Sequence, residues 1–289
     1  MKKILPILLV ILMILLGVGL LFYPDISTWY NSRVHSGLMQ TFDEEVAAMD
    51  DEYIAEHFRR AEAYNAALNG GSIEDPFVVG SGAVLPPAHY LETLNVNGMM
   101  AQIEIPIIDV HLPVFHGTGM AVLDRGVGHI EGTSFPIGGQ GTHAVLTGHS
   151  GLTHHRMFTD LEEIVIGDLF FITVLDRKLA YEVDQIIVVL PHEIESLRIA
   201  QDADYVTLIT CTPYAINTHR LLIRGARIPY EPGMIEEIVP VTRVIDWRLV
   251  IIIVMVLIFL FVFILFKRRE KKKARERRAQ KEQKERTGG

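Results

Sequence analysis

Residues 205–228 read YVTLITCTPYAINTHRLLIRGARI, two apolar and β-branched runs separated by a short polar segment. This pattern predicts two strands, Tyr205–Thr210 and Leu221–Ile228, that form a hairpin. The first strand delivers Cys211 to its end, and Pro213 stops the strand just beyond. A strand end is rigid, and the loop after it leaves a side chain accessible. The hairpin therefore offers a good position for a nucleophile.

Cys211 is the only cysteine of the 289 residues, so no disulfide can form within the chain. A lone thiol is either buried and inert, as a small apolar residue at the end of a core strand, or it is kept for chemistry. A thiolate attacks only where it is held in place and exposed. The residues around Cys211 decide between the two interpretations.

The hairpin predicts a cation beside the thiol. A connection of this length, with Asn217 and Thr218 in the turn, returns the second strand so that Arg220 can face Cys211. A guanidinium there would favour the thiolate and stabilise the oxyanion of a tetrahedral intermediate. Arg224 has the same strand parity, so periodicity does not choose between the two arginines, and either could be a solvated strand residue.

A base is the third expected member, and the chain contains 12 histidines. His149 lies in the run 144–152, AVLTGHSGL, at the end of another apolar strand and next to glycines, in a setting like that of Cys211. Other histidines are plausible by context: His129, His143 and His219. His154 and His155 resemble half of a metal site, but no matching Cys or His spacing occurs elsewhere. We therefore expect neither a metal nor a cofactor.

The remaining sequence predicts further short strands bounded by turn residues. Besides the hairpin, alternating or apolar runs mark 103–107, 144–146, 169–174 and 179–189. Several short strands at this spacing indicate a barrel or a sandwich, and the missing helix–strand alternation argues against a doubly wound sheet. Before them, apolar spacings of three, four and seven predict one helix over 41–68, which serves as a spacer or docking element. Acidic residues 43–45 are expected near the start of this helix, and Gly70-Gly71 at its end.

Two apolar stretches, residues 4–22 and 247–266, are each close to the length that crosses a bilayer as a helix. The first could also be a signal peptide, but no small-residue cleavage site follows it. Basic residues precede the first stretch and fill the tail after the second, which predicts that both ends are cytoplasmic. The segment between them carries 31 acidic and 12 basic residues. That net charge of −19 argues against nucleic acid as a partner.

Four motifs in order resemble those of a known family. Thr207–Cys211 (TLITC) looks like the TLxTC signature of sortases, and Thr147-Gly148-His149 looks like their histidine motif. The runs 126–134 (GVGHIEGTS) and 211–221 resemble the pilin-polymerising class C sortases. The resemblance covers most of residues 75–230 and extends to the double membrane anchor.

This resemblance implies a mainly-β fold, an eight-stranded sortase-type barrel with an N-terminal helical extension and two flanking transmembrane helices. It implies the catalytic set His149, Cys211 and Arg220, and so prefers Arg220 to Arg224. Four polar residues are candidates for the substrate groove: Ser134, Thr147, Thr210 and Asn217. Ser150, which follows the histidine, is a variable position in the family.

Class C sortases also carry an Asp-Pro-aromatic lid just before the barrel. Asp75-Pro76-Phe77 matches it, although the tripeptide alone would indicate only a turn with an aromatic residue. By resemblance, Asp75 would pair with Arg220 and Phe77 would lie against Cys211. Such a lid would occlude the cleft and open at a cost of about a few kcal/mol.

The expected organisation has seven parts: anchor or signal segment 1–23, helical extension 24–71, lid segment 72–82, catalytic barrel 83–232, juxtamembrane linker 233–246, transmembrane helix 247–266 and basic cytoplasmic tail 267–289. The barrel is then expected on the outer side of the membrane of a Gram-positive-type bacterium.

The resemblance implies a transpeptidase that cleaves an LPxTG-like sorting signal between Thr and Gly, and then joins it to a pilin lysine. Three alternatives stay open at this point. The chain could be a housekeeping sortase that anchors proteins to a cell-wall precursor, a thiol hydrolase, or a non-catalytic scaffold that binds sorting signals.

Overall fold

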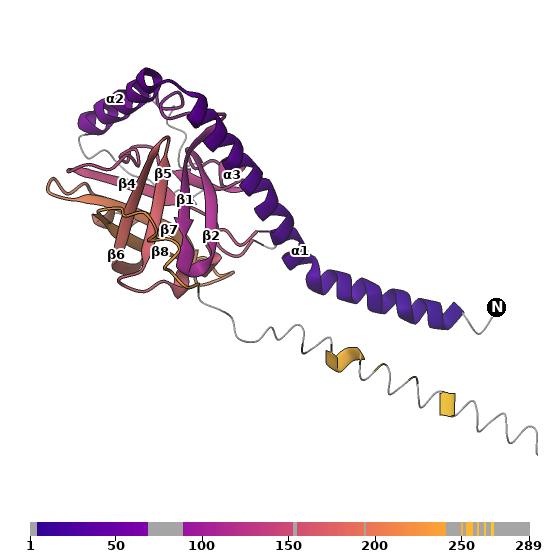
Figure 1. Ribbon diagram of the computed structural model, residues 1–289. Helices are drawn as coiled ribbons and strands as arrows, with labels where there is room; N and C mark the ends of the chain where they lie inside the picture. The colour runs from indigo at the N-terminus through magenta and orange to yellow at the C-terminus, as the bar shows by residue number, and fades with distance from the viewer. Residues whose placement is uncertain are drawn as a thin grey trace, which may run out of the picture. The chain divides into compact units, whose positions relative to one another are not determined.

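Eight strands close into a barrel in the order β1-β2-β3-β4-β7-β8-β6-β5 (Figure 1). Their bounds are β1 Met99–Ile105, β2 Val110–His116, β3 Val127–His129, β4 Thr142–Thr147, β5 Leu169–Val174, β6 Arg177–Val189, β7 Asp204–Thr212 and β8 His219–Ile228. The pairs β2–β3 and β4–β7 are parallel, and the other neighbours are antiparallel. The predicted mainly-β barrel is confirmed.

The computed structural model describes residues 5–68, 89–152, 155–193 and 195–240, with positions 250, 253–256, 259, 263, 267 and 268. One compact unit, residues 23–241, holds the barrel. The predicted lid segment 72–82, with Asp75, Pro76 and Phe77, lies outside the described residues.

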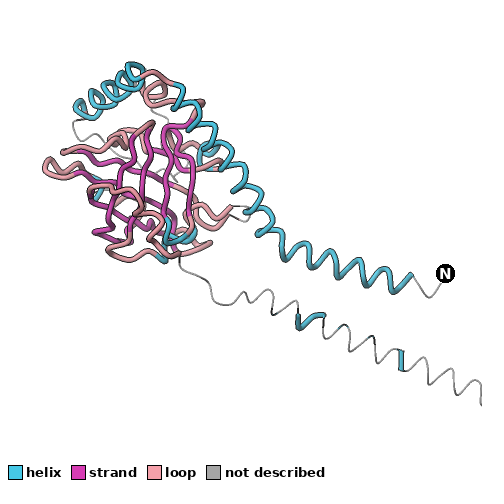
Figure 2. Tube along the Cα trace, viewed as in Figure 1, coloured by secondary structure: helices cyan, strands magenta, loops and turns pink. Residues whose placement is uncertain are grey.

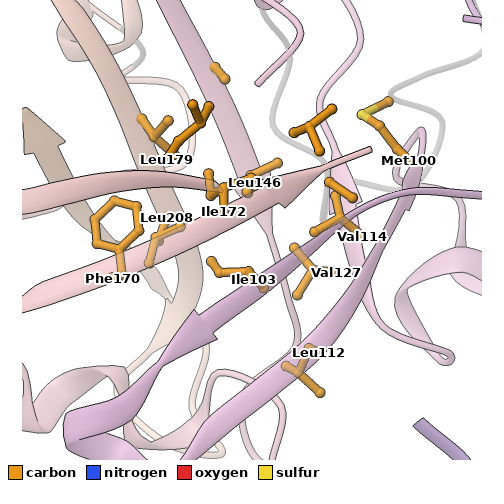
Figure 3. Close-up of a cluster of buried hydrophobic side chains, with 14 of the residues drawn as sticks. Met100, Ile103, Leu112, Val114, Val127, Leu146, Phe170, Ile172, Leu179 and Leu208 are labelled. Carbon is orange, nitrogen blue, oxygen red and sulfur yellow. The ribbon is translucent and has the colours of Figure 1, made fainter. Parts of the chain in front are cut away.

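Alternate residues of the strands fill the barrel interior with aliphatic and aromatic side chains (Figure 3). Ile103, Phe170 and Leu208 are fully buried there, and such burial stabilises the fold by roughly 1.5–3 kcal/mol for each side chain. Gly225 on β8 leaves room for the Phe170 ring, because a Cβ atom at this position would lie 2.4 Å from it. The interior is therefore a packed core, and the chemistry must lie on its surface.

A second, smaller hydrophobic cluster lies on the outer face of the barrel. It is formed by Ile130, Val145, Leu197, Ile209 and Leu222. Leu197 comes from the 3₁₀ helix η3 (Glu195–Leu197), in the connection between β6 and β7. This connection therefore covers part of the outer face of β4, β7 and β8.

Among the described residues, two helices precede the barrel where one was predicted. They are drawn in cyan in Figure 2. Helix α1 spans Leu5–Ala48, and α2 spans Asp51–Ala67. The chain breaks between them because the side chain of Asp50 caps α2 by accepting a hydrogen bond from the Tyr53 amide at 2.6 Å. Acidic residues 43–45 thus lie inside α1 and not at a helix start, contrary to the prediction.

The end of α2 is Ala67, before the predicted stop at Gly70-Gly71, which lies outside the described residues. Besides η3, three further 3₁₀ or short α segments lie in the described connections between strands: η1 (Pro106–Ile108), α3 (Met120–Leu123) and η2 (Thr159–Glu163).

Helix α2 docks on one end of the barrel, as the sequence indicated. Phe58 is buried under the Arg177 guanidinium, which lies 3.6 Å from the ring centroid. Asn65 bonds both the amide and the carbonyl of Phe135. Because Arg177 begins β6, this is the end where β6 starts, and we call it the α2 end. Cys211, near the end of β7, lies towards the opposite end.

Within the part of the chain that is described, no helix combines the length and the apolar character needed to cross a bilayer. Most of the second predicted span, 247–266, lies outside the described residues. The two-span assignment stays a prediction.

Candidate active site

The cysteine and the arginine lie side by side on neighbouring strands, as the hairpin pattern predicted. Antiparallel pairing of β7 with β8 sets Cys211 directly opposite Arg220. Each of the two residues is only 7% exposed. Leu208 and Leu221 belong to the interior core, so strand alternation places Cys211 and Arg220 on the outer face. A thiol and a guanidinium thus share one small region of the barrel surface.

The loop between the strands holds the Arg220 side chain in place. Its Nη1 donates to the carbonyl oxygens of Asn217 and His219, both at 3.1 Å. Asn217 adopts a left-handed backbone conformation, with φ of 61°, which lets the loop turn back towards β8. On its other side Arg220 is paired with Val189 of β6. The guanidinium is therefore fixed in direction.

Arg224 lies on the same face but serves another purpose. It is paired with Thr207, not with Cys211. Its Nε and Nη2 donate to the two carboxylate oxygens of Asp184 at 3.0 and 2.8 Å, and this hydrogen bonding raises the pKa of Arg224. The guanidinium also lies 4.2 Å from the centre of the Tyr205 ring. The structure therefore separates the two arginines, and Arg220 is the one at the thiol.

His149 reaches the same region through the parallel pairing of β4 and β7. The last paired residues are Thr147 and Ile209, and the Gly148 amide continues the ladder by donating to the Ile209 carbonyl at 3.1 Å. Two residues farther along each chain are His149 and Cys211. Alternation places Cys211 on the outer face, and His149, two residues beyond the end of β4, is partly exposed. The segment that carries His149 thus runs beside the end of β7, which in turn pairs with the strand of Arg220.

The loop after β4 is closed on itself by contacts at its base. The Phe158 amide donates to the His149 carbonyl at 3.0 Å. The Phe158 ring lies over Gly148, where a Cβ atom would approach to 2.9 Å. A side chain at position 148 would therefore push Phe158 away and shift the histidine. Close packing against Phe158 thus explains why position 148, just before the histidine, is a glycine.

Comparisons with known proteins agree with this geometry. A model of the Sortase domain matches residues 103–228. The crystal structure of Streptococcus pneumoniae sortase C is 43% identical and covers 67% of this chain and 97% of that chain, with a TM-score of 0.63. Sortase C1 of group B Streptococcus pilus island 1 is 41% identical and covers 71% of this chain and 97% of that one, with a TM-score of 0.65.

The chain belongs to the sortase family. A more distant relative is the Sortase A of Streptococcus agalactiae, 30% identical over 127 residues, which are 43% of this chain and 50% of that one. The chain thus spans half the length of this relative.

Two other histidines of this sortase have structural roles. His129 is completely buried, with Nδ1 bonded to the Tyr90 hydroxyl and Nε2 to the Ser134 carbonyl, and burial lowers its pKa to about 3. His143 is also buried, which lowers its pKa, and it bonds the Arg198 carbonyl and the Thr207 hydroxyl. Both rings are held by these hydrogen bonds.

The two remaining candidates are also placed. His219 precedes Arg220 on β8, so alternation puts its side chain on the opposite face of the strand from Arg220. His155 stacks on His35 of α1 with ring centroids 4.5 Å apart, while His154 lies outside the described residues. Within the described ranges, no three His, Cys, Asp or Glu side chains gather as metal ligands would.

The predicted groove residues occupy different positions in this sortase. Ser134 is fully buried, and its hydroxyl accepts a hydrogen bond from the His143 amide. Thr147 and Thr210 are buried, and their hydroxyls donate to the carbonyls of Ile209 and Gly148 at 3.3 and 2.8 Å. Asn217 is exposed in the β7–β8 loop. The two threonines thus fasten the strand ends that carry the candidate catalytic residues.

Sequence reasoning passed over two residues of this region. The Ser150 hydroxyl donates to the Cys211 carbonyl at 2.7 Å. Phe158 packs against Gly148 and donates its amide hydrogen to the His149 carbonyl. No periodicity in the sequence links Phe158 to His149. A hydroxyl directly after the histidine was the available signal for Ser150.

Proposed function

We propose that this sortase is a pilin-polymerising transpeptidase that acts through Cys211, His149 and Arg220. The observation that supports the proposal is the strand register: Cys211 lies opposite Arg220 in the β7–β8 ladder, and His149 follows β4 next to the end of β7. A thiol, a titratable imidazole and a fixed cation are the groups that acyl transfer through a thioester requires.

The first half of the reaction forms the thioester. The Cys211 thiolate attacks the carbonyl carbon of the Thr–Gly bond in an LPxTG-like signal. When the tetrahedral intermediate collapses, the carbon–nitrogen bond breaks, and the His149 imidazolium gives its proton to the departing glycine amine. The acyl chain stays on sulfur, and His149 is left neutral.

The second half uses the same groups in reverse. Neutral His149 takes a proton from the lysine amine of an acceptor pilin as its nitrogen attacks the thioester carbonyl. The carbon–sulfur bond breaks, an isopeptide bond has formed, and the thiolate and the imidazolium are restored. No cofactor is consumed.

Arg220 is suited to stabilise the charge that develops on the carbonyl oxygen in both halves. Its guanidinium is held by two loop carbonyls and by its position across from Cys211, so it need not reorganise during the reaction. A preorganised cation at a developing oxyanion is a large source of rate enhancement.

The similarity to two sortases C supports pilins as the substrates. The identity is 41–43% to the two sortases C described above, one of which is described with a pilin substrate specificity and the other by its pilus island. Identity to the Sortase A is lower, at 30%. The acceptor amine is therefore proposed to be a pilin lysine and not a cell-wall precursor.

Control by a lid at Asp75, Pro76 and Phe77 is part of the same proposal, and it rests on the sequence resemblance. The Asp75→Ala/Phe77→Ala chain should form product faster than the parent if this segment occludes Cys211.

The test uses the full-length chain with an LPxTG-type peptide and a lysine-bearing pilin, analysed by mass spectrometry. We expect a peptide thioester on Cys211 and an amide-linked product, and neither with Cys211→Ala. An alkylating agent that modifies Cys211 shows that the thiol is reduced and accessible.

Three outcomes separate the alternatives. Hydrolysed peptide without amide product, even with excess amine, would indicate a thiol hydrolase. Transfer to a cell-wall-type amine in preference to pilin would indicate a housekeeping sortase. No adduct at all, with Cys211 still reactive to the alkylating agent, would leave a scaffold that binds sorting signals.

A further inference from the structure

Side-chain hydroxyls continue the β4–β7 ladder beyond the end of β4. Backbone pairing of these strands stops at Thr147 and Ile209. Beyond it, the Thr210 hydroxyl donates to the Gly148 carbonyl at 2.8 Å, and the Ser150 hydroxyl donates to the Cys211 carbonyl at 2.7 Å. Each bond crosses between the same two segments. The segments thus stay together where the strand itself has ended.

His149 lies between these two bonds. Gly148, the residue before it, is tied to Thr210, and Ser150, the residue after it, is tied to Cys211. The residues on both sides of His149 are therefore hydrogen-bonded to the segment that carries the thiol. Thr210 is buried at 1% exposure, whereas Ser150 is partly exposed. Of the two bonds, the one from Ser150 is thus the closer to solvent.

We propose that Ser150 is a positioning residue for the thiol and imidazole pair: its hydroxyl, by donating to the Cys211 carbonyl, sets how closely His149 approaches Cys211. The inference rests on the proposed function for its meaning in catalysis. It concerns a residue that need not touch the substrate and that acts through its neighbours on both strands.

The geometry distinguishes this role from ordinary packing. The Ser150 side chain is small and partly exposed, so we expect removal of its hydroxyl to leave the core unchanged. The next backbone contact in the loop, from the Gly151 amide to the Thr159 hydroxyl at 3.0 Å, ties the loop to η2 and not to β7. Without the Ser150 bond, the loop around His149 would therefore keep its contacts to Phe158 and η2 but lose this contact to β7. The separation of imidazole and sulfur would then vary more.

The direct test is a pH titration of the Cys211 thiolate by its ultraviolet absorbance, in the full-length chain without substrate. Cys211 is the only cysteine, so the Cys211→Ser chain is a complete blank. A nearby imidazolium stabilises a thiolate. We expect Ser150→Ala to raise the titration midpoint by about half a pH unit, and His149→Ala to raise it further.

Matched variants separate the hydroxyl from other changes. Ser196→Ala removes the same atoms from a serine whose buried hydroxyl has no hydrogen-bond partner among the described residues, so it should leave the midpoint unchanged. Ser150→Thr and Ser150→Val have nearly the same shape but differ in the hydroxyl. We expect Thr to keep the parent midpoint and Val to shift it as Ala does.

A kinetic readout complements the titration. With the sorting-signal peptide, Ser150→Ala should lower kcat roughly tenfold and leave KM unchanged, because approach geometry is affected and binding is not. Ser150→Thr should restore kcat.

Several results would overturn the inference. One is a Ser150→Ala midpoint equal to that of the parent, and another is equal midpoints for Ser150→Thr and Ser150→Val. An unchanged midpoint in His149→Ala would remove the pair on which Ser150 is proposed to act. Because the titration needs no substrate, these outcomes differ from a failure of the proposed function, in which the parent titrates normally but transfers no peptide.

Discussion

Strands β4, β7 and β8 and the loop after β4 carry two similar sets of residues, and the two sets differ in their proposed roles. The inner set is His143, Thr207 and Arg224, with Asp184 beside it. The terminal set is His149, Cys211 and Arg220. Each contains a histidine after or on β4, a polar residue of β7 and an arginine of β8, and the sets are separated by only four to six residues along each strand.

The inner set is saturated by fixed partners. Both His143 ring nitrogens are bonded, to the Arg198 carbonyl at 3.0 Å and the Thr207 hydroxyl at 2.8 Å. Arg224 makes two bonds to Asp184. A ring with two static bonds and a guanidinium held by its own carboxylate stabilise the barrel but have no capacity for a reacting molecule.

The terminal set lies where strand pairing stops. Position on the strand, and not residue type, therefore separates structural from proposed catalytic residues. Loops border the terminal set and can admit a substrate, whereas His143 of the inner set lies at the start of β4, away from the loop that carries His149. The predictions below compare equivalent substitutions in the two sets.

The largest difference is expected between the two histidines. His149→Ala should lower kcat/KM by roughly 10²–10⁴-fold, because general acid–base catalysis contributes about that much. It should leave the free energy of unfolding nearly unchanged. His143→Ala should do the reverse: activity stays within a few-fold, while stability falls by about 2 kcal/mol as two buried groups lose their partner.

Urea unfolding and peptide-transfer kinetics on both variants check this prediction. If His143→Ala, still folded at the assay temperature, lost as much activity as His149→Ala, the division into two sets would be wrong.

The arginines should show the next largest contrast. Arg220→Ala is expected to reduce kcat by about 10²–10³-fold, as the loss of an oxyanion donor does. Arg224→Ala should change kcat by less than about twofold, since Arg224 lies opposite Thr207 and is engaged by Asp184. Arg220→Lys is the informative intermediate, because it keeps the charge but loses the two fixed loop contacts of Nη1. Steady-state kinetics with saturating peptide measure all three variants, and equal losses from Arg220→Ala and Arg224→Ala would refute the assignment.

The sequence predicted the hairpin partners and the outline of the site. Alternation and turn residues were enough to place an arginine of the second strand, Arg220 or Arg224, on the same face as Cys211, because the hairpin returns the second strand beside the first. Choosing between Arg220 and Arg224 required the family resemblance, since the carboxylate of Asp184 that engages Arg224 comes from β6, 40 residues away.

Other elements left no usable pattern in the sequence. Strand β3 has only three residues with Gly128 at its centre, and β2 contains Pro113, so neither shows a clear alternation. The break between α1 and α2 depends on the Asp50 cap, which the continuous apolar spacing concealed. The bond from Ser150 to Cys211 depends on parallel pairing of β4 with β7, a long-range contact that local sequence does not encode.

The free energy of unfolding should fall in acid because of a histidine of the inner set. Burial lowers the pKa of His143 in the folded chain, whereas in the unfolded chain it is near 6.5. Below pH 6.5 the unfolded chain therefore binds a proton that the folded chain resists. The stabilising contribution of neutral His143 is complete above pH 6.5 and is lost as pH falls towards the lowered pKa. His129, with a pKa of about 3, acts in the same direction.

Replacing His143 by Gln, which does not titrate, should thus reduce the dependence of unfolding free energy on pH. The slope between pH 6.5 and 5 is expected to decrease by at most about 1.4 kcal/mol per pH unit, the effect of one proton. Urea unfolding at several pH values measures it. A slope identical to that of the parent would mean that His143 binds its proton equally in both states.

The smallest expected effect concerns the ion pair of the inner set. The Arg224 and Asp184 side chains are 24% and 32% exposed, so solvent weakens their attraction despite the two well-formed bonds. A double-mutant cycle with Arg224→Gln and Asp184→Asn should therefore give a coupling energy of about 0.5–1 kcal/mol, smaller at high salt. Coupling of several kcal/mol would show that the pair is sealed from water. The inner set would then owe its structural role to charge pairing more than to the saturated histidine. The stacking of the Arg224 guanidinium on Tyr205 at 4.2 Å does not enter this coupling energy, because it does not need Asp184.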